Sequence, residues 1–212
     1  DVYRACKDER IDFVSGMEFR KDGHLLYICI AKNREGFQEI NEYLTQCNLR
    51  KTKPADHAPP FNNVYVLYPM ECGYPEKLRD NEYIAVRPSS RYRKLLNRMV
   101  AWVPISFHKK EDYEVHRHLR AIDNNCLLPM LKDFMLAQED EYISTVENIK
   151  TAFAHEPILL ENAEEILHQC SFDIDLSVTR NKKIFTGSRY DDKLLLEKLT
   201  FDGFPLRYPG EP

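Results

Sequence analysis

The sequence has no long apolar run, no excess of basic residues and no Cys-x-x-Cys pair. No stretch approaches the roughly 18 apolar residues of a membrane span, and the first residues lack the apolar core of a signal peptide. The 30 basic and 34 acidic residues give a net charge of −4, whereas a domain that binds nucleic acid through its phosphates is usually basic. We therefore expect a soluble, folded protein without a membrane partner, and only local or indirect contact with DNA.

Several catalytic motifs are absent as well. The chain contains no Gly-x-x-x-x-Gly-Lys phosphate loop, no Gly-x-Ser-x-Gly nucleophile elbow and no His-Glu-x-x-His zinc helix. The six cysteines are scattered, and several lie in apolar runs such as Tyr27-Ile28-Cys29-Ile30. This distribution is typical of buried free thiols in a reducing compartment, so it predicts a cytoplasmic protein.

Two histidines, His116 and His118, lie close to Glu114 in the sequence. Helix residues two positions apart point to different faces, whereas the histidines of helical zinc sites are four positions apart. We therefore interpret this region as a solvated, partly packed helix face rather than a metal site.

The first half of the chain contains short apolar segments typical of strands. Residues 11–19 and 25–31, joined by the turn Lys21-Asp22-Gly23, predict two neighbouring strands inside a sheet. Asn33 is placed to cap a helix over residues 34–47. Further strands are expected at residues 63–68, 83–86 and 99–107, with a helical segment at 92–98. The prediction is an α/β fold with a mixed sheet and flanking helices.

Beyond Glu111 the pattern changes to that of helices. We expect helices at residues 113–122, 139–153, 159–170 and 190–199, the last one stopping at Gly203. Together with the first half, this pattern predicts an α/β portion over residues 1–125 and a mainly helical remainder over residues 126–212.

Four blocks of sequence resemble one known family in the correct order. Gly16-Met17-Glu18-Phe19 and the string at residues 24–37 are similar to the Gly-x-Glu-Phe and His-Leu-x-x-Leu-Ala-Lys-Asn-x-Glu-Gly-Tyr segments of the polymerase-and-histidinol-phosphatase (PHP) domain in the alpha subunit of bacterial DNA polymerase III. Residues 112–122, 160–170 and 194–208 resemble three later segments of that domain. The resemblance is closest to the versions found in the Bacteroides group of bacteria.

The resemblance implies a PHP-type distorted (β/α) barrel, present in part and followed by a helical C-terminal segment that leads towards the polymerase palm. Residues 1–13 are similar to the family's preceding helix and strand, so we expect an upstream section that carries the family's His-x-His motif. The parent protein would be a DNA-directed DNA polymerase, a nucleotidyltransferase of DNA replication, whose catalytic aspartates lie beyond this segment. The implied partners are the remainder of the polymerase chain, DNA through the whole replicase, and the proofreading exonuclease subunit.

The family's active site is a cluster of metal ions, held by histidines and carboxylates, that activates water against a phosphoester. By resemblance, Glu18 and His24 match two of its ligands. Each residue alone has a plainer interpretation, because charged and polar residues are mostly exposed: Glu18 as a solvated carboxylate at a strand end and His24 as a polar residue closing a turn.

Three other ligand positions of the family are changed in this chain. They align with Ala85, Pro104 and Ser106. Alanine and proline offer no ligand atom, and a serine hydroxyl is a poor ligand for zinc or manganese. His108 lies two residues beyond Ser106, roughly 6–7 Å along a strand, which is too far for an unchanged site.

We therefore expect a degenerate metal site without a cofactor, in a domain kept for a structural or docking role. The alternative is an active metal-dependent phosphoesterase or 3′-5′ exonuclease that uses zinc or manganese with Glu18 and His24. The basic run with Arg180, Lys182 and Lys183 is a solvated surface or, in a replicase, a contact to template DNA.

Overall fold

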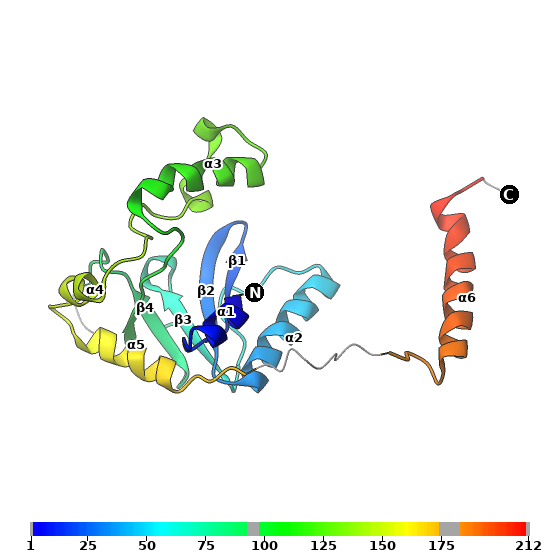
Figure 1. Ribbon diagram of the computed structural model, residues 1–212, viewed down its shortest axis with the longest axis horizontal. Coiled ribbons are helices and arrows are strands. Elements are labelled where there is room, and N and C mark those ends of the chain that lie inside the picture. Colours follow the sequence, from blue (N-terminus) through cyan, green and yellow to red (C-terminus); the bar gives the residue numbers. More distant parts are fainter. Residues whose placement is uncertain (1, 93–97, 174–182, 211–212) are drawn as a thin grey trace. The chain divides into compact units, whose positions relative to one another are not determined.

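The computed structural model describes residues 2–92, 98–173 and 183–210. The chain divides into two compact units, Asp1–Asp173 and Ile174–Pro212. The first unit is a mixed α/β structure (Figure 1). Its main elements in chain order are α1 (Val2–Asp8), β1 (Gly16–Lys21), β2 (His24–Ala31), α2 (Arg34–Arg50), β3 (Val64–Pro69), β4 (Glu82–Val86), β5 (Met99–Ala101), α3 (Tyr113–Asp123), α4 (Val146–Ala152) and α5 (Ile158–His168). Short 3-10 turns cover Met70–Cys72, Lys110–Asp112, Leu128–Met130 and Asp133–Met135.

The five strands form one open mixed sheet in the order β1-β2-β3-β4-β5. The pairs β1–β2 and β2–β3 are antiparallel, and the pairs β3–β4 and β4–β5 are parallel. Four strands therefore run in the same direction, and only β2 runs against them. Consequently the carboxyl ends of β1, β3, β4 and β5 and the start of β2 lie at the same edge of the sheet.

The β1–β2 hairpin closes at Asp22 and Gly23, whose φ angles are 53° and 86°. Two positive φ angles in an Asp-Gly turn are the usual geometry of a tight hairpin, so the predicted turn is confirmed. The expectation of an interior strand from residue 11 is wrong. The strand starts at Gly16, opposite Ile30 near the end of β2, with one backbone hydrogen bond of 2.9 Å from the Ala31 N–H to the Ser15 carbonyl oxygen just before it, and β1 is an edge strand of the described sheet.

The helix α2 begins as predicted, because the side chain of Asn33 accepts a hydrogen bond of 2.9 Å from the backbone N–H of Gly36. It packs against β2 and β3. Gly36 lies so close to the chain before β3 that an added Cβ would be 1.9 Å from the carbonyl oxygen of Asn63. Only glycine allows this approach between the helix and the sheet.

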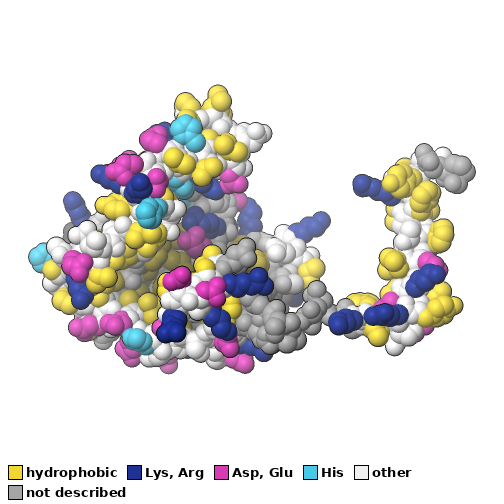
Figure 2. All heavy atoms as spheres, viewed as in Figure 1, with side chains coloured by type: hydrophobic (Ala, Val, Ile, Leu, Met, Phe, Trp, Pro, Cys, Tyr) yellow, Lys and Arg dark blue, Asp and Glu magenta, His cyan; other side chains and the backbone are white. Residues whose placement is uncertain are grey.

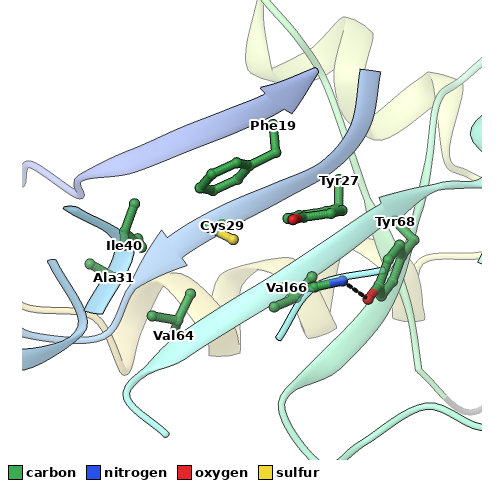
Figure 3. Packing of buried hydrophobic residues seen from close by; sticks show 9 residues of the cluster. Phe19, Tyr27, Cys29, Ala31, Ile40, Val64, Val66 and Tyr68 are labelled. Atoms are coloured by element: carbon green, nitrogen blue, oxygen red, sulfur yellow. Dashed lines mark hydrogen bonds between the residues drawn. The ribbon is translucent and has the colours of Figure 1, made fainter. Parts of the chain in front are cut away.

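Apolar clusters cover both faces of the sheet. On one face, large side chains of β1, β2 and β3 pack with Ile40 of α2, as Figure 3 shows for Phe19, Tyr27, Cys29, Val64, Val66 and Tyr68. The dashed line in Figure 3 is the 3.0 Å hydrogen bond from the Ala58 N–H to the Tyr68 hydroxyl. On the other face, Leu67, Ala85 and Val100 pack with Ile166 of α5. Burying one large apolar side chain stabilises the folded state by about 1.5–3 kcal/mol. These two clusters therefore hold the sheet, and with it the edge at which β1, β3, β4 and β5 end, in a fixed position.

Three predicted elements differ from the structure. The expected strand at 99–107 ends at Ala101, and only Phe107 pairs again, in an isolated bridge to Tyr142. The expected helix at 139–153 begins only at Val146, because Tyr142 is held in that bridge and Thr145 caps the helix. The helical segment expected at 92–98 lies largely outside the described residues.

The second unit contains α6 (Arg189–Arg207), with Ser188 as its N-cap. The predicted stop at Gly203 is wrong, because the helix continues through Gly203 and Pro205. A glycine inside a helix costs only about 1 kcal/mol relative to alanine, which does not by itself end a helix. No helix of the described residues is long and apolar enough to cross a membrane. All six cysteines are free thiols, although only Cys29 and Cys47 are buried.

Candidate functional site

A pocket of about 1030 Å³ lies at the edge of the sheet where β1, β3, β4 and β5 end. In α/β folds, ligand sites usually lie at the carboxyl ends of parallel strands. The pocket is lined by the β1–β2 hairpin, the residues that follow β3, β4 and β5, the helix α3 and residues 133–141. It therefore collects side chains that are far apart in the sequence.

Four of the five positions singled out from the sequence line this pocket: Glu18, His24, Pro104 and Ser106. Glu18 and His24 come from the hairpin, and the other two from the segment after β5. Ala85 is fully buried and lies in the apolar cluster with Leu67, Val100 and Ile166. It contributes a methyl group to the core and no ligand atom to the pocket.

Glu18 is held by a neighbouring arginine. The Nε and Nη2 atoms of Arg20 both donate to Glu18 Oε2, at 2.9 and 2.7 Å. A third donor of Arg20 reaches the carbonyl oxygen of Gly23 at 3.0 Å, which links the carboxylate to the hairpin turn. The charge of Glu18 is therefore already balanced by a guanidinium.

The imidazole ring of His24 lies against an aromatic ring. Its ring centroid is 4.6 Å from that of Phe134, at an interplanar angle of 37°. Phe134 also covers Gly23, where an added Cβ would lie 2.7 Å from the phenyl ring. The short turn Asp133–Met135 thus covers the hairpin and one wall of the pocket.

Ser106 takes part in a polar network around the buried side chains of Arg87 and Glu141. Its hydroxyl donates to Glu141 Oε2 at 2.6 Å, and its backbone N–H donates to the carbonyl oxygen of Glu141 at 2.8 Å. The other carboxylate oxygen of Glu141 accepts from Arg87 Nη1 at 2.8 Å and from the Gln138 N–H at 3.1 Å. Arg87 Nη2 donates to Asp140 Oδ1 at 2.6 Å.

Arg87 is the most deeply buried charge of the pocket, with 5% of its surface exposed. It directly follows β4, and its guanidinium carbon lies 5.4 Å from the centroid of the Trp102 ring. Its Nε is buried and has no hydrogen-bond partner among the described residues. The guanidinium is thus fixed between two carboxylates and an indole.

The electrostatics of Glu141 follow from these contacts. Burial alone would raise the pKa of Glu141, but the hydrogen bonds from Ser106 and Arg87 outweigh it, so that the pKa is lowered. Glu141 is therefore an anion near neutral pH, and Arg87 is its counter-ion.

His116 has a structural role. Its Nε2 accepts a hydrogen bond of 3.0 Å from the Ala137 N–H, which requires an unprotonated Nε2 and ties α3 to residues 133–141. Burial and the charge of Arg120 lower the pKa of His116, in agreement with a neutral ring. The exposed His118 instead contacts the carbonyl oxygen of Glu114 in its own helix. The two histidines therefore act separately, as their spacing predicts.

Taken together, the candidate residues do not fit a metal centre as they are arranged. Glu18 is paired with Arg20, His24 stacks on Phe134, and Pro104 and Ser106 supply at most one weak ligand atom. In the part of the chain that the structure describes, no three His, Cys, Asp or Glu side chains are grouped to hold a metal ion.

A scan of family models and a search of curated proteins found no match to this chain. The site is therefore interpreted from its own residues.

Sequence reasoning missed Arg87, Asp140 and Glu141. A signal for Arg87 exists, because a charged residue directly follows the apolar strand Glu82–Val86. No local signal assigns Asp140 and Glu141 to the same site, since they lie more than fifty residues further along the chain, in a stretch that was expected to be helical.

The basic run expected at residues 180–183 is described only in part. Arg180 and Lys182 lie outside the described residues, and Lys183 is exposed in the second unit, before α6. On the face of the first unit shown in Figure 2, basic and acidic side chains are interspersed. This mixture agrees with the nearly equal numbers of basic and acidic residues in the sequence.

Proposed function

We propose that this chain is part of a PHP-type domain of a DNA polymerase III alpha subunit, and that it serves as a structural and docking part of the replicase instead of hydrolysing phosphoesters. The observation that carries the proposal is the pocket itself. Four positions that the resemblance assigns to the family's metal ligands, Glu18, His24, Pro104 and Ser106, line one pocket at the carboxyl ends of the strands. In this proposal the open sheet is a portion of the family's distorted barrel.

The loss of hydrolytic function is proposed because of the chemistry of the pocket wall. Arg20 forms an ion pair with Glu18, and Arg87 forms ion pairs with Asp140 and Glu141, so these carboxylates are already engaged. A phosphoesterase of this family would need several free carboxylates and imidazoles around its metal ions. The alternative, an active metal-dependent phosphoesterase, has only Glu18 and His24 to draw on from the positions aligned with family ligands.

The docking role is supported by an apolar stripe on α3. Val115, Leu119 and Ile122 follow helical spacing and are 57%, 59% and 75% exposed. Leu127 and Met130, just after the helix, are exposed as well, and hydrophobic side chains gather on this surface in Figure 2. Contiguous exposed apolar side chains of this kind are typical of protein interaction sites.

Metal analysis and a nuclease assay test the hydrolytic alternative. We expect the complete domain, prepared from the full-length protein so that all its ligand positions are present, to carry less than one transition metal ion per molecule and to release no nucleotides from DNA 3′ ends in the presence of Zn²⁺ or Mn²⁺. The matched control is Glu18→Ala, because any hydrolysis that this variant retains comes from a contaminant. Two or more tightly bound metal ions together with hydrolysis that depends on Glu18 would refute the proposed loss of activity.

A pull-down with the proofreading exonuclease subunit tests the docking role. The substitution Leu119→Asp places a charge in the apolar stripe, and we expect it to weaken binding about tenfold or more, as for a central interface residue. Arg117→Ala changes the opposite face of α3 and should leave binding unchanged. Equal capture of both variants would exclude this stripe as the docking surface.

A further inference from the structure

Residues 133–138, which we name the strap, form one wall of the pocket. The ring centroid of Phe134 lies 4.6 Å from that of His24, so the strap lies over the β1–β2 hairpin. Just beyond the strap, Glu141 is fixed by its ion pair with Arg87. The strap is therefore anchored at its carboxyl end and covers the hairpin side of the pocket.

Two hydrogen bonds from α3 hold the strap in place. Arg120 Nε donates to the carbonyl oxygen of Met135 at 2.7 Å, and His116 Nε2 accepts from the Ala137 N–H at 3.0 Å. Helix positions four residues apart lie on the same face, so both bonds leave from one side of α3. The guanidinium of an arginine is not deprotonated in proteins. The bond to His116 needs a ring nitrogen without a proton, so it is the bond that acid can break.

The surroundings of His116 disfavour a proton on its ring. Among the described residues, the ionisable groups that face the ring are Tyr113 and Arg120 of α3 and Glu141 beyond the strap, while Phe107 adds an uncharged aromatic face. Burial and the charge of Arg120 lower the pKa of His116, and together they outweigh the opposite effect of Glu141. A proton on Nε2 would also set two N–H donors against each other where one hydrogen bond now forms.

We propose that His116 is a proton-sensitive latch: when its ring is protonated it releases the Ala137 N–H, and the strap then leaves the hairpin more often and opens the pocket. In the open form the ring is in water and has its ordinary pKa of 6.5, whereas the closed form holds the pKa lower. The latch is therefore fully engaged above pH 6.5 and weakens as the pH falls towards the lower pKa of the closed form. The inference goes beyond the proposed function, because it depends on these contacts and not on the family of the chain.

Hydrogen exchange of the strap tests the proposal, because backbone amides exchange when a segment opens locally. Exchange is followed by mass spectrometry of strap peptides from the intact protein at pH 7.5 and 5.5, and is corrected for the pH dependence of exchange in an unfolded chain. We expect the peptides that contain Ala137 to open about three- to tenfold more often at the lower pH, tenfold being the limit one pH unit below the ordinary value. Equal protection at both pH values would overturn the proposal.

Substitutions at position 116 separate the lost acceptor from the added charge. In His116→Gln the side-chain carbonyl can still accept from the Ala137 N–H but does not titrate, so the strap should stay protected at both pH values. In His116→Ala the acceptor is gone, so exchange should be faster and the same at both pH values. A pH response that survives in His116→Gln would overturn the proposal, even if the alanine variant fails to fold.

The other histidines near the strap provide the controls. His118 is exposed and contacts the carbonyl oxygen of Glu114 in its own helix, so His118→Gln should keep the wild-type pH response. His24 lies against Phe134 of the strap, and a response that disappears in His24→Gln would identify that ring as the sensor and overturn the role of His116. The measurement needs neither metal nor partner, so its outcome is separate from those of the nuclease assay and the pull-down.

Discussion

Replacing Gly36 with alanine is expected to lower the free energy of unfolding of the first unit by about 3 kcal/mol or more. The added Cβ would lie 1.9 Å from the carbonyl oxygen of Asn63, 2.9 Å from its carbonyl carbon and 3.3 Å from Cα of Ala31. All three are backbone atoms, so no side-chain rotation relieves the clash.

The surrounding hydrogen bonds leave the backbone little room to move. The carbonyl oxygen of Asn63 accepts from the Lys32 N–H at 2.9 Å, and Asn63 donates to Glu39 of α2 through its backbone and its side chain. Separating α2 from the sheet would break these bonds. We therefore expect the cost to appear as lost stability and not as a local adjustment.

Urea unfolding followed by the fluorescence of Trp102 measures this effect, because Trp102 is the one tryptophan in the sequence and lies in the first unit. Gly203→Ala is the matched control, since nothing lies within 4 Å of the added Cβ and the residue belongs to α6 in the second unit. It should leave the Trp102 transition unchanged. A Gly36→Ala protein with the wild-type midpoint would contradict the close contact between α2 and Asn63.

Replacing Glu82 with alanine is expected to cost about 3 kcal/mol of stability. The Glu82 side chain is 1% exposed and accepts hydrogen bonds from the Tyr68 hydroxyl at 3.0 Å and the Arg79 N–H at 2.7 Å, besides its ion pair with Arg79. Alanine leaves a buried hydroxyl and a cation without their acceptor. This loss of stability is at the lower end of the range for a broken buried ion pair, because the Arg79 side chain is 38% exposed and water can reach it.

The difference in the free energy of unfolding between wild type and Glu82→Ala should depend on pH, which provides a second measurement. Burial alone would raise the pKa of Glu82, but the hydrogen bonds from Arg79 and Tyr68 outweigh it and hold the pKa below its ordinary value of 4.5. The stabilisation is therefore present above pH 4.5 and is lost as the pH falls through the lower pKa of the folded state. The difference in stability should be largest near neutral pH and shrink in acid.

Asp80→Ala provides the control for this prediction. Asp80 is fully exposed and pairs with Arg98 at 3.0 Å, and exposed ion pairs contribute little to stability. Its removal should leave the urea midpoint nearly unchanged. Equal effects of Glu82→Ala and Asp80→Ala would show that the Glu82 carboxylate is not buried in solution.

Two residues of the string at 24–37, Asn33 and Gly36, have structural roles of their own. Asn33 caps α2, and Gly36 permits its close approach to the chain before β3. The sequence could predict the cap, because asparagine before an amphipathic helix has a local signature. It could not predict the close approach, because Asn63 lies twenty-seven residues away.

Where the sequence predictions failed, long-range contacts decided the outcome. Residues 139–145 have a helical composition, yet Tyr142 pairs with Phe107, while Asp140 and Glu141 bind Arg87. Local propensity is a weak effect of less than about 1 kcal/mol per residue, and buried hydrogen bonds and ion pairs outweigh it. In the segment after Ala101 the reason is local, because Pro104 has no backbone N–H to donate to a neighbouring strand.

The sequence by itself determined the α/β class, the hairpin turn at Asp22 and Gly23, the start of α2 and the separate roles of His116 and His118. Each depends on spacing or conformational preference within a few residues. Only the tertiary structure decided that Glu18, His24, Pro104 and Ser106 line one pocket, that Ala85 lies in the core, and that Arg87 pairs with Asp140 and Glu141 beside Ser106. These facts depend on which strand ends meet at one edge of the sheet, and that is set by the packing of both faces against α2 and α5.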